Sequence, residues 1–237
     1  MAAAAGAGAD AEVDFEFFPI IRRYKSGRVE RFMNIPPLPA GTDPATGVTS
    51  KDVVVDPAIG LWARLFLPPG AGAGTSQGKL PVVVYYHGGA YVVGSAADPF
   101  THSYLNGLVA EAGVLAVALE YRLAPEHHLP AAYDDSWEGL RWVASHANGG
   151  GGAEPWLLDH GDIAARVAAD RVLVCVAEKD SLRDRGVWYY ESLKASGYAG
   201  EVDLLESMGE GHVFYCMDPR CEKAREMQAR ILSFLRK

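Results

Sequence analysis

The sequence is 237 residues long, with 49% hydrophobic and 22% charged residues. These proportions are those of a single globular domain with a sizeable core. The formal net charge of −8 and the acidic isoelectric point argue against nucleic acid or an anionic membrane surface as the main partner.

The first residues are acidic and low in complexity, and we predict a disordered tail over 1–14 ahead of a single domain over 15–237. The tail has no basic stretch followed by an apolar one, so it does not resemble a secretory signal, and it lacks the arginine and serine of a transit peptide. No apolar run approaches the length of a membrane span. Three cysteines are too few for a disulfide framework, which favours a reducing compartment, and we predict a cytoplasmic protein.

The segment Phe15–Arg31 mixes aromatic and basic residues, and we expect a helix or an arm that lies over a hydrophobic surface. After a turn-rich linker, Lys51–Asp56 and Leu61–Leu67 are rich in apolar residues. The second of these runs alternates as a half-buried strand does. Both runs therefore predict short β-strands near the start of the domain.

Pro81–Tyr86 is a continuous apolar run of the kind found in a strand that is buried on both faces of a parallel sheet. The spacing of apolar residues predicts a helix over Pro99–Ala112, and Val114–Leu119 predicts a second buried strand. Tyr133–His146 again has helical spacing, with two aspartates near its start, where the helix dipole favours negative charge. The first part of the domain therefore alternates strand and helix.

The same alternation returns in the last third of the chain. Arg171–Ala177 predicts a third buried strand, in which we expect Cys175 to be a buried free thiol. A helix is predicted over Val187–Lys194, a fourth strand over Glu201–Glu206 and an amphipathic closing helix over Cys221–Arg236. Strands that alternate with helices predict an α/β fold with a mostly parallel sheet flanked by helices.

Residues with catalytic potential follow three of the predicted strands, at the sheet edge where α/β proteins form their active sites. Gly88 and Gly89 can turn backbone N–H groups toward a developing oxyanion, or can simply connect strand to helix. Asp180 can orient an imidazole, or can cap the following helix. His212 can act as a general base, or can lie in a surface loop. An aspartate followed by a histidine one helix and one strand later is the chain order of an α/β-hydrolase triad.

Four segments resemble the motifs of plant carboxylesterases, which belong with the gibberellin receptors to the hormone-sensitive-lipase-like branch of the α/β-hydrolases. They are HGGAY (87–91), YRLAPEHHLPAAYDD (121–135), AEKDSLRDRG (177–186) and GEGHVF (209–214). The resemblance implies an esterase that forms an acyl-enzyme on serine, with Asp180 as the orienting acid and His212 as the base. It also implies an oxyanion hole at Gly88, Gly89 and Ala90, where the family commonly has a third glycine in place of Ala90.

The family carries its serine in a Gly-x-Ser-x-Gly turn between a strand and a helix, ahead of the acid. In this chain that turn should fall between 147 and 170, where the sequence has no serine and no strand-like run. The family lead-in survives as Trp156–Asp162 and is followed almost at once by the strand at Arg171. We infer an internal deletion near Asp162/Ile163 that removes the central nucleophile strand and its neighbour, so that the chain has no nucleophile.

Other candidates for a nucleophile or a metal ligand lack the required context. Gly74–Gly78 matches the Gly-x-Ser-x-Gly pattern, but it follows a glycine-rich loop and precedes a strand rather than a helix. Ser136 and Ser181 have no such turn. His127 and His128 have no third ligand at a recognisable spacing, so we predict no metal and no cofactor.

We therefore predict a carboxylesterase-family serine hydrolase without its nucleophile, with weak or no turnover of carboxylic esters. An alternative is a non-catalytic protein that binds a small molecule, as the gibberellin receptors do, but those receptors lack the triad histidine that is present here as His212. A third reading is a working esterase that uses Ser76 after rearrangement. The expected partner is a small hydrophobic ester or acid, with no nucleic acid and no membrane span, and the oligomeric state is left open.

Overall fold

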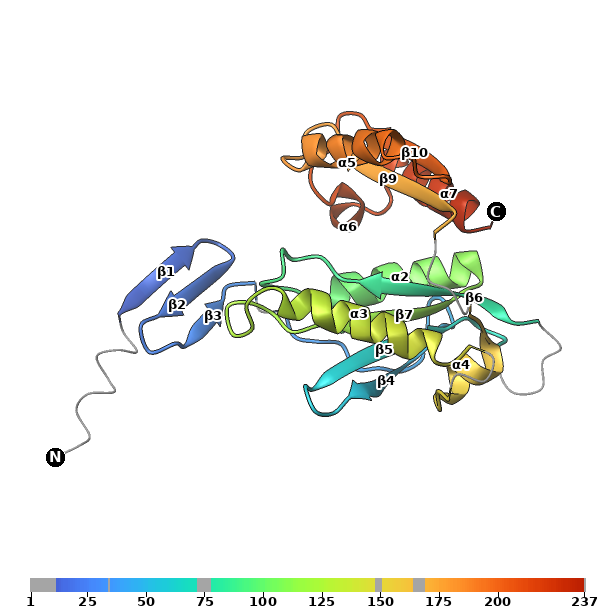
Figure 1. Cartoon of the computed structure of the whole chain (residues 1–237), viewed down its shortest axis with the longest axis horizontal. Helices are drawn as coiled ribbons and strands as arrows, with labels where there is room; N and C mark the ends of the chain where they lie inside the picture. Colours follow the sequence, from blue (N-terminus) through green and yellow to red (C-terminus); the bar gives the residue numbers. More distant parts are fainter. Residues whose placement is uncertain (1–11, 34, 72–77, 148–150, 164–168, 237) are drawn as a thin grey trace. The chain divides into compact units, whose positions relative to one another are not determined.

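The computed structural model describes residues 12–33, 35–71, 78–147, 151–163 and 169–236. The chain divides into two compact units, an N-terminal unit, Met1–Ile163, and a C-terminal unit, Ala164–Lys237 (Figure 1). Each unit has a hydrophobic core of its own. The boundary between the units adjoins position 162/163, where the sequence analysis places a deletion.

The N-terminal unit begins with a small antiparallel sheet of three strands, β1 (Val13–Phe17), β2 (Ile21–Tyr24) and β3 (Val29–Arg31). Of the two expectations for this segment, a helix or an arm that lies over a hydrophobic surface, the helix is wrong. Pro19 and Gly27 lie in the two connections, and each run between these turn residues is too short for a stable helix. Opposite charges on β1 and β2 pair across the strands, which favours this register.

A mixed five-stranded sheet forms the body of the N-terminal unit, with strand order β4-β5-β7-β6-β8. Its strands are β4 (Thr49–Asp56), β5 (Leu61–Leu67), β6 (Leu80–Tyr86), β7 (Leu115–Glu120) and β8 (Gly161–Asp162). β4, β5 and β7 pair antiparallel, whereas β6 runs parallel to β7 on one side and to β8 on the other. Because β6 and β7 are parallel neighbours, the residues that follow them meet at one edge of the sheet.

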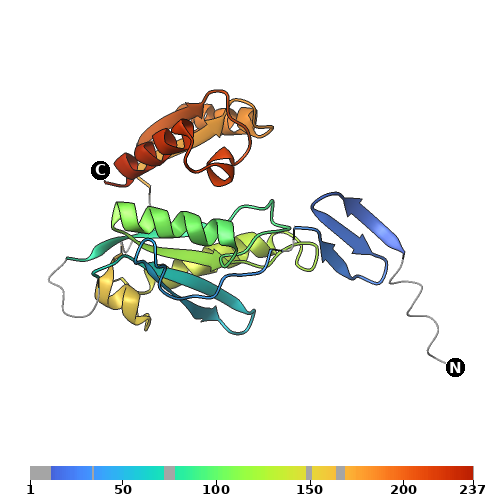
Figure 2. The same cartoon turned by 180° about the vertical axis from the view of Figure 1, so that it is seen from behind.

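Helices cover both faces of this sheet. α2 (Pro99–Ala112) lies on one face, and α3 (Ala131–Ala144) lies on the other, as the two opposite views show (Figures 1 and 2). The short helix α4 (Pro155–His160) leads into β8. The buried core on the face of α3 and α4 consists of Ala63, Leu65, Leu67, Ala71, Leu115, Val117, Leu119, Val143 and Leu157.

The burial of the two parallel strands differs from one to the other. β7 is buried from Leu115 to Leu119, as its sequence predicts. The prediction that β6 is buried on both faces is wrong, since Pro81 and Tyr86 are exposed and the residues between them are half-buried. The physical reason is that β8 pairs only with Leu80 and Pro81, so most of that edge of β6 has no neighbouring strand among the described residues.

The C-terminal unit is a βαβ unit followed by two helices. Its elements are β9 (Arg171–Ala177), α5 (Arg183–Ala195), β10 (Glu201–Ser207), α6 (Phe214–Met217) and α7 (Glu222–Leu235). β9 and β10 pair parallel over seven residues each. A small core joins the strands to α6 and α7 through Ala177, Phe214, Ala224 and Met227.

Strand β9 is less buried than its apolar sequence predicts. Within the described residues it pairs with β10 alone, so one of its edges carries no strand. The prediction of a buried thiol at Cys175 is wrong, because this cysteine is exposed. Residues Val172 to Val174 are only half-buried. An apolar strand with an open edge is a pattern that native proteins normally avoid.

Candidate active site

The first group of candidate residues is Gly88, Gly89 and Ala90, in the turn that follows β6. Gly89 has a φ of +116°, and a Cβ atom at this position would lie 2.0 Å from the carbonyl oxygen of Val93. Ala90 and Tyr91 have φ values of +54° and +64°, in the left-handed region that most residues avoid. The turn therefore depends on glycine at position 89, and Ala90 holds its left-handed conformation at some cost in strain.

The backbone amides of this turn are free to bind an acceptor. Within the described residues, the N–H groups of Gly88, Gly89 and Ala90 donate to no protein acceptor. By contrast, the amides of Val92 and Val93 both donate to the Gly89 carbonyl oxygen, at 3.0 and 3.1 Å. Gly88 and Ala90 are also exposed to solvent. Unpaired, accessible N–H groups at a strand end are what an oxyanion hole requires.

A buried aromatic pair supports the start of the turn. The ring of His87 stacks on the ring of Tyr121, with centroids 4.2 Å apart and planes 7° from parallel. The Tyr121 hydroxyl donates to the His87 carbonyl oxygen at 2.5 Å. Burial raises the pKa of Tyr121, so the hydroxyl keeps its proton and remains a donor at neutral pH. This contact ties the end of β6 to the residue that follows β7.

Arg31 of β3 connects the turn to the YRLAPE segment. Its Nε donates to the Val92 carbonyl oxygen at 2.6 Å, and its Nη2 donates to the Ala124 carbonyl oxygen at 3.0 Å. The guanidinium also pairs with both oxygens of Glu126, and this hydrogen bonding lowers the pKa of the Glu126 carboxyl. The sequence pattern does not reveal the role of Arg31, because one arginine among several basic residues carries no signal of its own.

The second group of candidate residues is the pair Asp180 and His212 in the C-terminal unit. The Nδ1 atom of His212 lies 2.8 Å from Oδ2 of Asp180. The other carboxylate oxygen accepts a hydrogen bond from the N–H of Leu182 at 2.8 Å, so the Asp180 carboxylate contacts both the histidine ring and the turn that leads into α5. Partial burial opposes ionisation, but the Leu182 amide and His212 together outweigh it and lower the pKa of Asp180.

Backbone contacts hold the two loops of this pair together at the ends of β9 and β10. The N–H of Lys179 donates to the Glu210 carbonyl oxygen at 2.8 Å, and the Gly209 N–H donates to the Glu178 carboxylate at 2.6 Å. The His212 side chain is 58% exposed. Within the described residues of its own unit, its Nε2 atom has no hydrogen-bond partner.

The structure brings the predicted site residues together in two groups. Gly88, Gly89 and Ala90 share one turn of the N-terminal unit, and Asp180 and His212 form a hydrogen-bonded pair in the C-terminal unit. The match at 74–78 lies outside the described residues except for its last glycine.

The other predicted side chains lie outside these groups. The hydroxyl of Ser136 donates to the Ala132 carbonyl oxygen within α3, and Ser181 is exposed beside Asp180. Among the described residues, no cluster of three or more side chains is suited to a metal ion. None of the described helices is long and apolar enough to cross a membrane.

Comparison with known proteins identifies the class. A family model described as the alpha/beta hydrolase fold matches residues 83–168. Among solved structures, an esterase from the archaeon Pyrobaculum calidifontis aligns over 78% of this chain and 84% of its own, with a TM-score of 0.60 and 22% identity. A bacterial heroin esterase aligns with a TM-score of 0.62 over 80% and 84% of the two chains, at 19% identity. The chain has the α/β-hydrolase fold.

Curated relatives define the family within this class. A 2-hydroxyisoflavanone dehydratase from Glycyrrhiza echinata is 33% identical over 99% of this chain and 100% of its own length. A probable carboxylesterase from Arabidopsis thaliana is 31% identical over 96% and 99% of the two chains. A chloroplastic tuliposide A-converting enzyme from Tulipa gesneriana is 32% identical over 96% and 80%. The chain belongs to the plant carboxylesterase family.

The relatives are longer than this chain, although the Glycyrrhiza and Arabidopsis proteins are matched almost from end to end. The alignment with the Glycyrrhiza protein spans 332 positions, 95 more than the 237 residues of this chain. At least that many aligned positions therefore have no residue here.

Proposed function

We propose that this protein is a carboxylesterase-family hydrolase that lacks its nucleophile elbow, and that it hydrolyses carboxylic esters weakly or not at all. The observation that carries the proposal is the absence of any serine between 147 and 170, where the family's elbow is expected. The surplus of positions in the relatives, and the end of the family-model match at residue 168, support a gap near Asp162/Ile163.

The open edges of the two sheets support the same gap. β8 is two residues long, and it pairs with β6 in parallel at the edge where a further strand would continue the sheet. Across the proposed gap, β9 is the next strand, and within the described residues it pairs with β10 alone. Loss of a strand, a helix and a second strand between β8 and β9 accounts for two half-buried apolar strands with free edges.

In this proposal the remaining residues keep the roles that the family gives them. The N–H groups of Gly88, Gly89 and Ala90 would stabilise the oxyanion of a tetrahedral intermediate. His212 would take a proton at Nε2 from an attacking hydroxyl, and Asp180 would hold the imidazole and stabilise its cation. Without a serine, the histidine has no protein hydroxyl to activate. The ligand of such a site is a small hydrophobic ester or acid.

The test is hydrolysis of p-nitrophenyl acetate and p-nitrophenyl butyrate by the full chain. We expect a rate close to that of buffer, the same rate for His212→Ala, and no covalent labelling by a fluorophosphonate probe. His127→Ala, which changes an exposed histidine, is the matched control. Rapid hydrolysis that is lost in His212→Ala but kept in His127→Ala would overturn the proposal, and mass spectrometry of the labelled chain would then locate the nucleophile.

A gain-of-function variant tests the position of the gap. The missing strand–turn–helix segment of a curated relative, inserted between Asp162 and Ile163, should restore hydrolysis that depends on the inserted serine and on His212. A correctly folded insertion variant without activity, checked by its circular dichroism and its cooperative unfolding, would show that the gap is not the reason for low turnover.

A further inference from the structure

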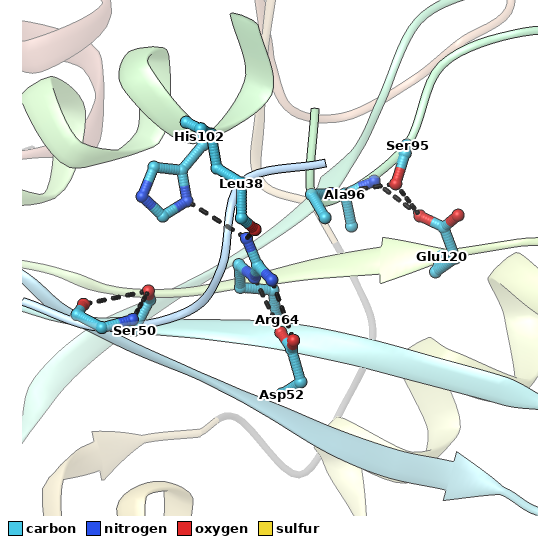
Figure 3. A network of polar contacts seen from close by, with 10 residues as sticks. Leu38, Ser50, Asp52, Arg64, Ser95, Ala96, His102 and Glu120 are labelled. Carbon is cyan, nitrogen blue, oxygen red and sulfur yellow. Dashed lines mark hydrogen bonds and ion pairs between the residues drawn. The ribbon is translucent and has the colours of Figure 1, made fainter. Parts of the chain in front are cut away.

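The segment Leu38–Thr46 lies in the connection between β3 and β4. Two hydrogen bonds of its first residue, one at the N–H and one at the carbonyl oxygen, anchor it to the rest of the unit. The Leu38 N–H donates to the Ala97 carbonyl oxygen at 2.8 Å. Its carbonyl oxygen accepts Nη1 of Arg64, from β5, at 2.7 Å (Figure 3). The Arg64 side chain is only 3% exposed, and it pairs with both oxygens of Asp52 at 2.7 and 2.8 Å. A buried guanidinium therefore fastens this segment to the sheet.

His102 of α2 contacts the same guanidinium, at the nitrogen that also donates to Leu38. Its Nδ1 atom is 3.4 Å from Nη1 of Arg64 (Figure 3), and its ring is tilted against Phe66 at 5.3 Å. A guanidinium can only donate, so a hydrogen bond here requires Nδ1 to accept, which is the case for a neutral ring with its proton on Nε2. Burial, and then the charge of Arg64, lower the pKa of His102.

An acidic residue lies across a cavity from this ring. The cavity, of about 530 Å³, is lined by the segment on one side and by His102 and Asn106 of α2 on the other. Asp43 belongs to the segment side, where its Oδ2 accepts the N–H and the hydroxyl of Thr46 at 2.8 and 2.6 Å. These bonds, the hydroxyl first, lower the pKa of Asp43, so it carries a negative charge at neutral pH.

We propose that His102 is a proton-operated latch, in which the neutral ring accepts from Arg64 and the protonated ring turns across the cavity to the Asp43 carboxylate. Three charged groups face the ring from the elements around it: Arg64 of β5, Asp52 of β4 and Asp43 of the segment. A protonated Nδ1 would set a second donor and a second positive charge against Nη1 of Arg64, whereas both carboxylates favour the cation. Of these three charged groups, only Asp43 lines the cavity together with the His102 ring, so it is the acceptor that the cation can reach by turning into the cavity.

The turn closed by Asp43 loosens in the protonated state. A hydrogen bond from the His102 cation to the Asp43 carboxylate competes with the two hydrogen bonds that Thr46 donates to this carboxylate. Those two bonds close the turn before Val48. Two backbone hydrogen bonds of this turn should then open more often. One runs from the Asp43 N–H to the Val48 carbonyl oxygen, and the other from the Gly47 N–H to the Asp43 carbonyl oxygen, each at 2.8 Å. The latch does not depend on ester hydrolysis, because none of its residues belongs to the candidate active site.

The first test is nitrogen-detected NMR of the histidine rings in the full chain. At pH 8 we expect His102 to be the neutral Nε2–H tautomer, and at pH 5 we expect both ring nitrogens to carry protons. An Nδ1–H tautomer at pH 8, or a ring that stays neutral at pH 5, would overturn the proposal. Because this experiment uses the unaltered chain, it stands even if a variant fails to fold.

The second test is hydrogen exchange of the amides from 38 to 48, followed from pH 8 to pH 5. After correction for intrinsic rates, we expect exchange at Asp43 and Gly47 to rise more than about tenfold. His102→Gln, which can still accept from Arg64 but does not titrate, should abolish the rise, and His127→Gln should retain it. A rise of the same size in His102→Gln, or no rise in the unaltered chain, would contradict the latch.

Discussion

The turn after β6 places Gly89 and Ala90 next to each other, each with a positive φ. Substituting glycine by alanine, and alanine by glycine, should therefore change the free energy of unfolding in opposite directions. Gly89→Ala forces a Cβ atom to within 2.0 Å of the Val93 carbonyl oxygen, against rigid backbone. We expect it to lower the free energy of unfolding by more than about 2 kcal/mol. Ala90→Gly relieves a left-handed alanine at φ +54°, so we expect a change between zero and a gain of about 1 kcal/mol.

Urea unfolding of the two variants, followed by tryptophan fluorescence, measures both effects. The pair controls itself, because the substitutions are adjacent and differ by one methyl group each. Equal destabilisation by both variants would mean that the observed left-handed turn is not the conformation of this segment in solution.

Single residues show which parts of the candidate site can be read from sequence. Asp180 and His212 were predicted from their order after two strands, and the structure places them 2.8 Å apart. Their catalytic roles, and those of Gly88, Gly89 and Ala90, remain predictions. Arg31 could not be predicted, because its three acceptors come from segments far away in the chain. The buried thiol at Cys175 was predicted wrongly because local apolarity does not reveal whether a strand has neighbours.

At the level of elements, one buried ion pair connects the end of β7 to α3. Asp135 of α3 is 1% exposed, and its carboxylate accepts the backbone N–H of Arg122 at 2.9 Å and the Arg122 guanidinium at 2.7 Å. Asp135→Ala would leave these donors without their acceptor. We therefore expect it to cost about 3 kcal/mol of unfolding free energy, measured by urea unfolding of the full chain.

Helix α3 also supplies a matched control for this substitution. Glu138 pairs with Arg141 on the exposed surface of the same helix, at 3.3 Å. Exposed ion pairs of this kind contribute little to the free energy of unfolding. We therefore expect Glu138→Ala to change that free energy by no more than about 0.5 kcal/mol. Similar losses for Glu138→Ala and Asp135→Ala would show that the buried contact contributes nothing beyond the charge removed from the helix.

The elements themselves were largely predictable wherever hydrophobic periodicity extends over a whole segment. The helix over Pro99–Ala112 and the strand over Leu61–Leu67 have the predicted bounds. The prediction failed over Phe15–Arg31, where three strands of three to five residues are too short to show alternation. It also failed for the burial of β6, because burial depends on a neighbouring strand that local sequence cannot reveal.

At the scale of the whole chain, the two units differ in how well each is packed. The N-terminal unit has a cluster of nine buried apolar residues on one face of a five-stranded sheet. The cluster of the C-terminal unit has four, on a two-stranded parallel sheet. None of the thirteen residues of α5 is buried, and Trp188 is 70% exposed. Such a unit stabilises its backbone hydrogen bonds weakly, because little apolar surface is removed from water around them.

We therefore expect native-state hydrogen exchange to distinguish the units. The amides of β9 and β10 should open at lower urea concentrations than those of β5 and β7, with opening free energies smaller by at least about 2 kcal/mol. An inserted nucleophile segment, as described for the activity test, should narrow that difference, because added strands would cover the free edges of β6 and β9. Equal protection of β9 and β7 in the chain without the insertion would mean that β9 has a neighbouring strand in solution, and it would remove the main structural support for a gap between the units.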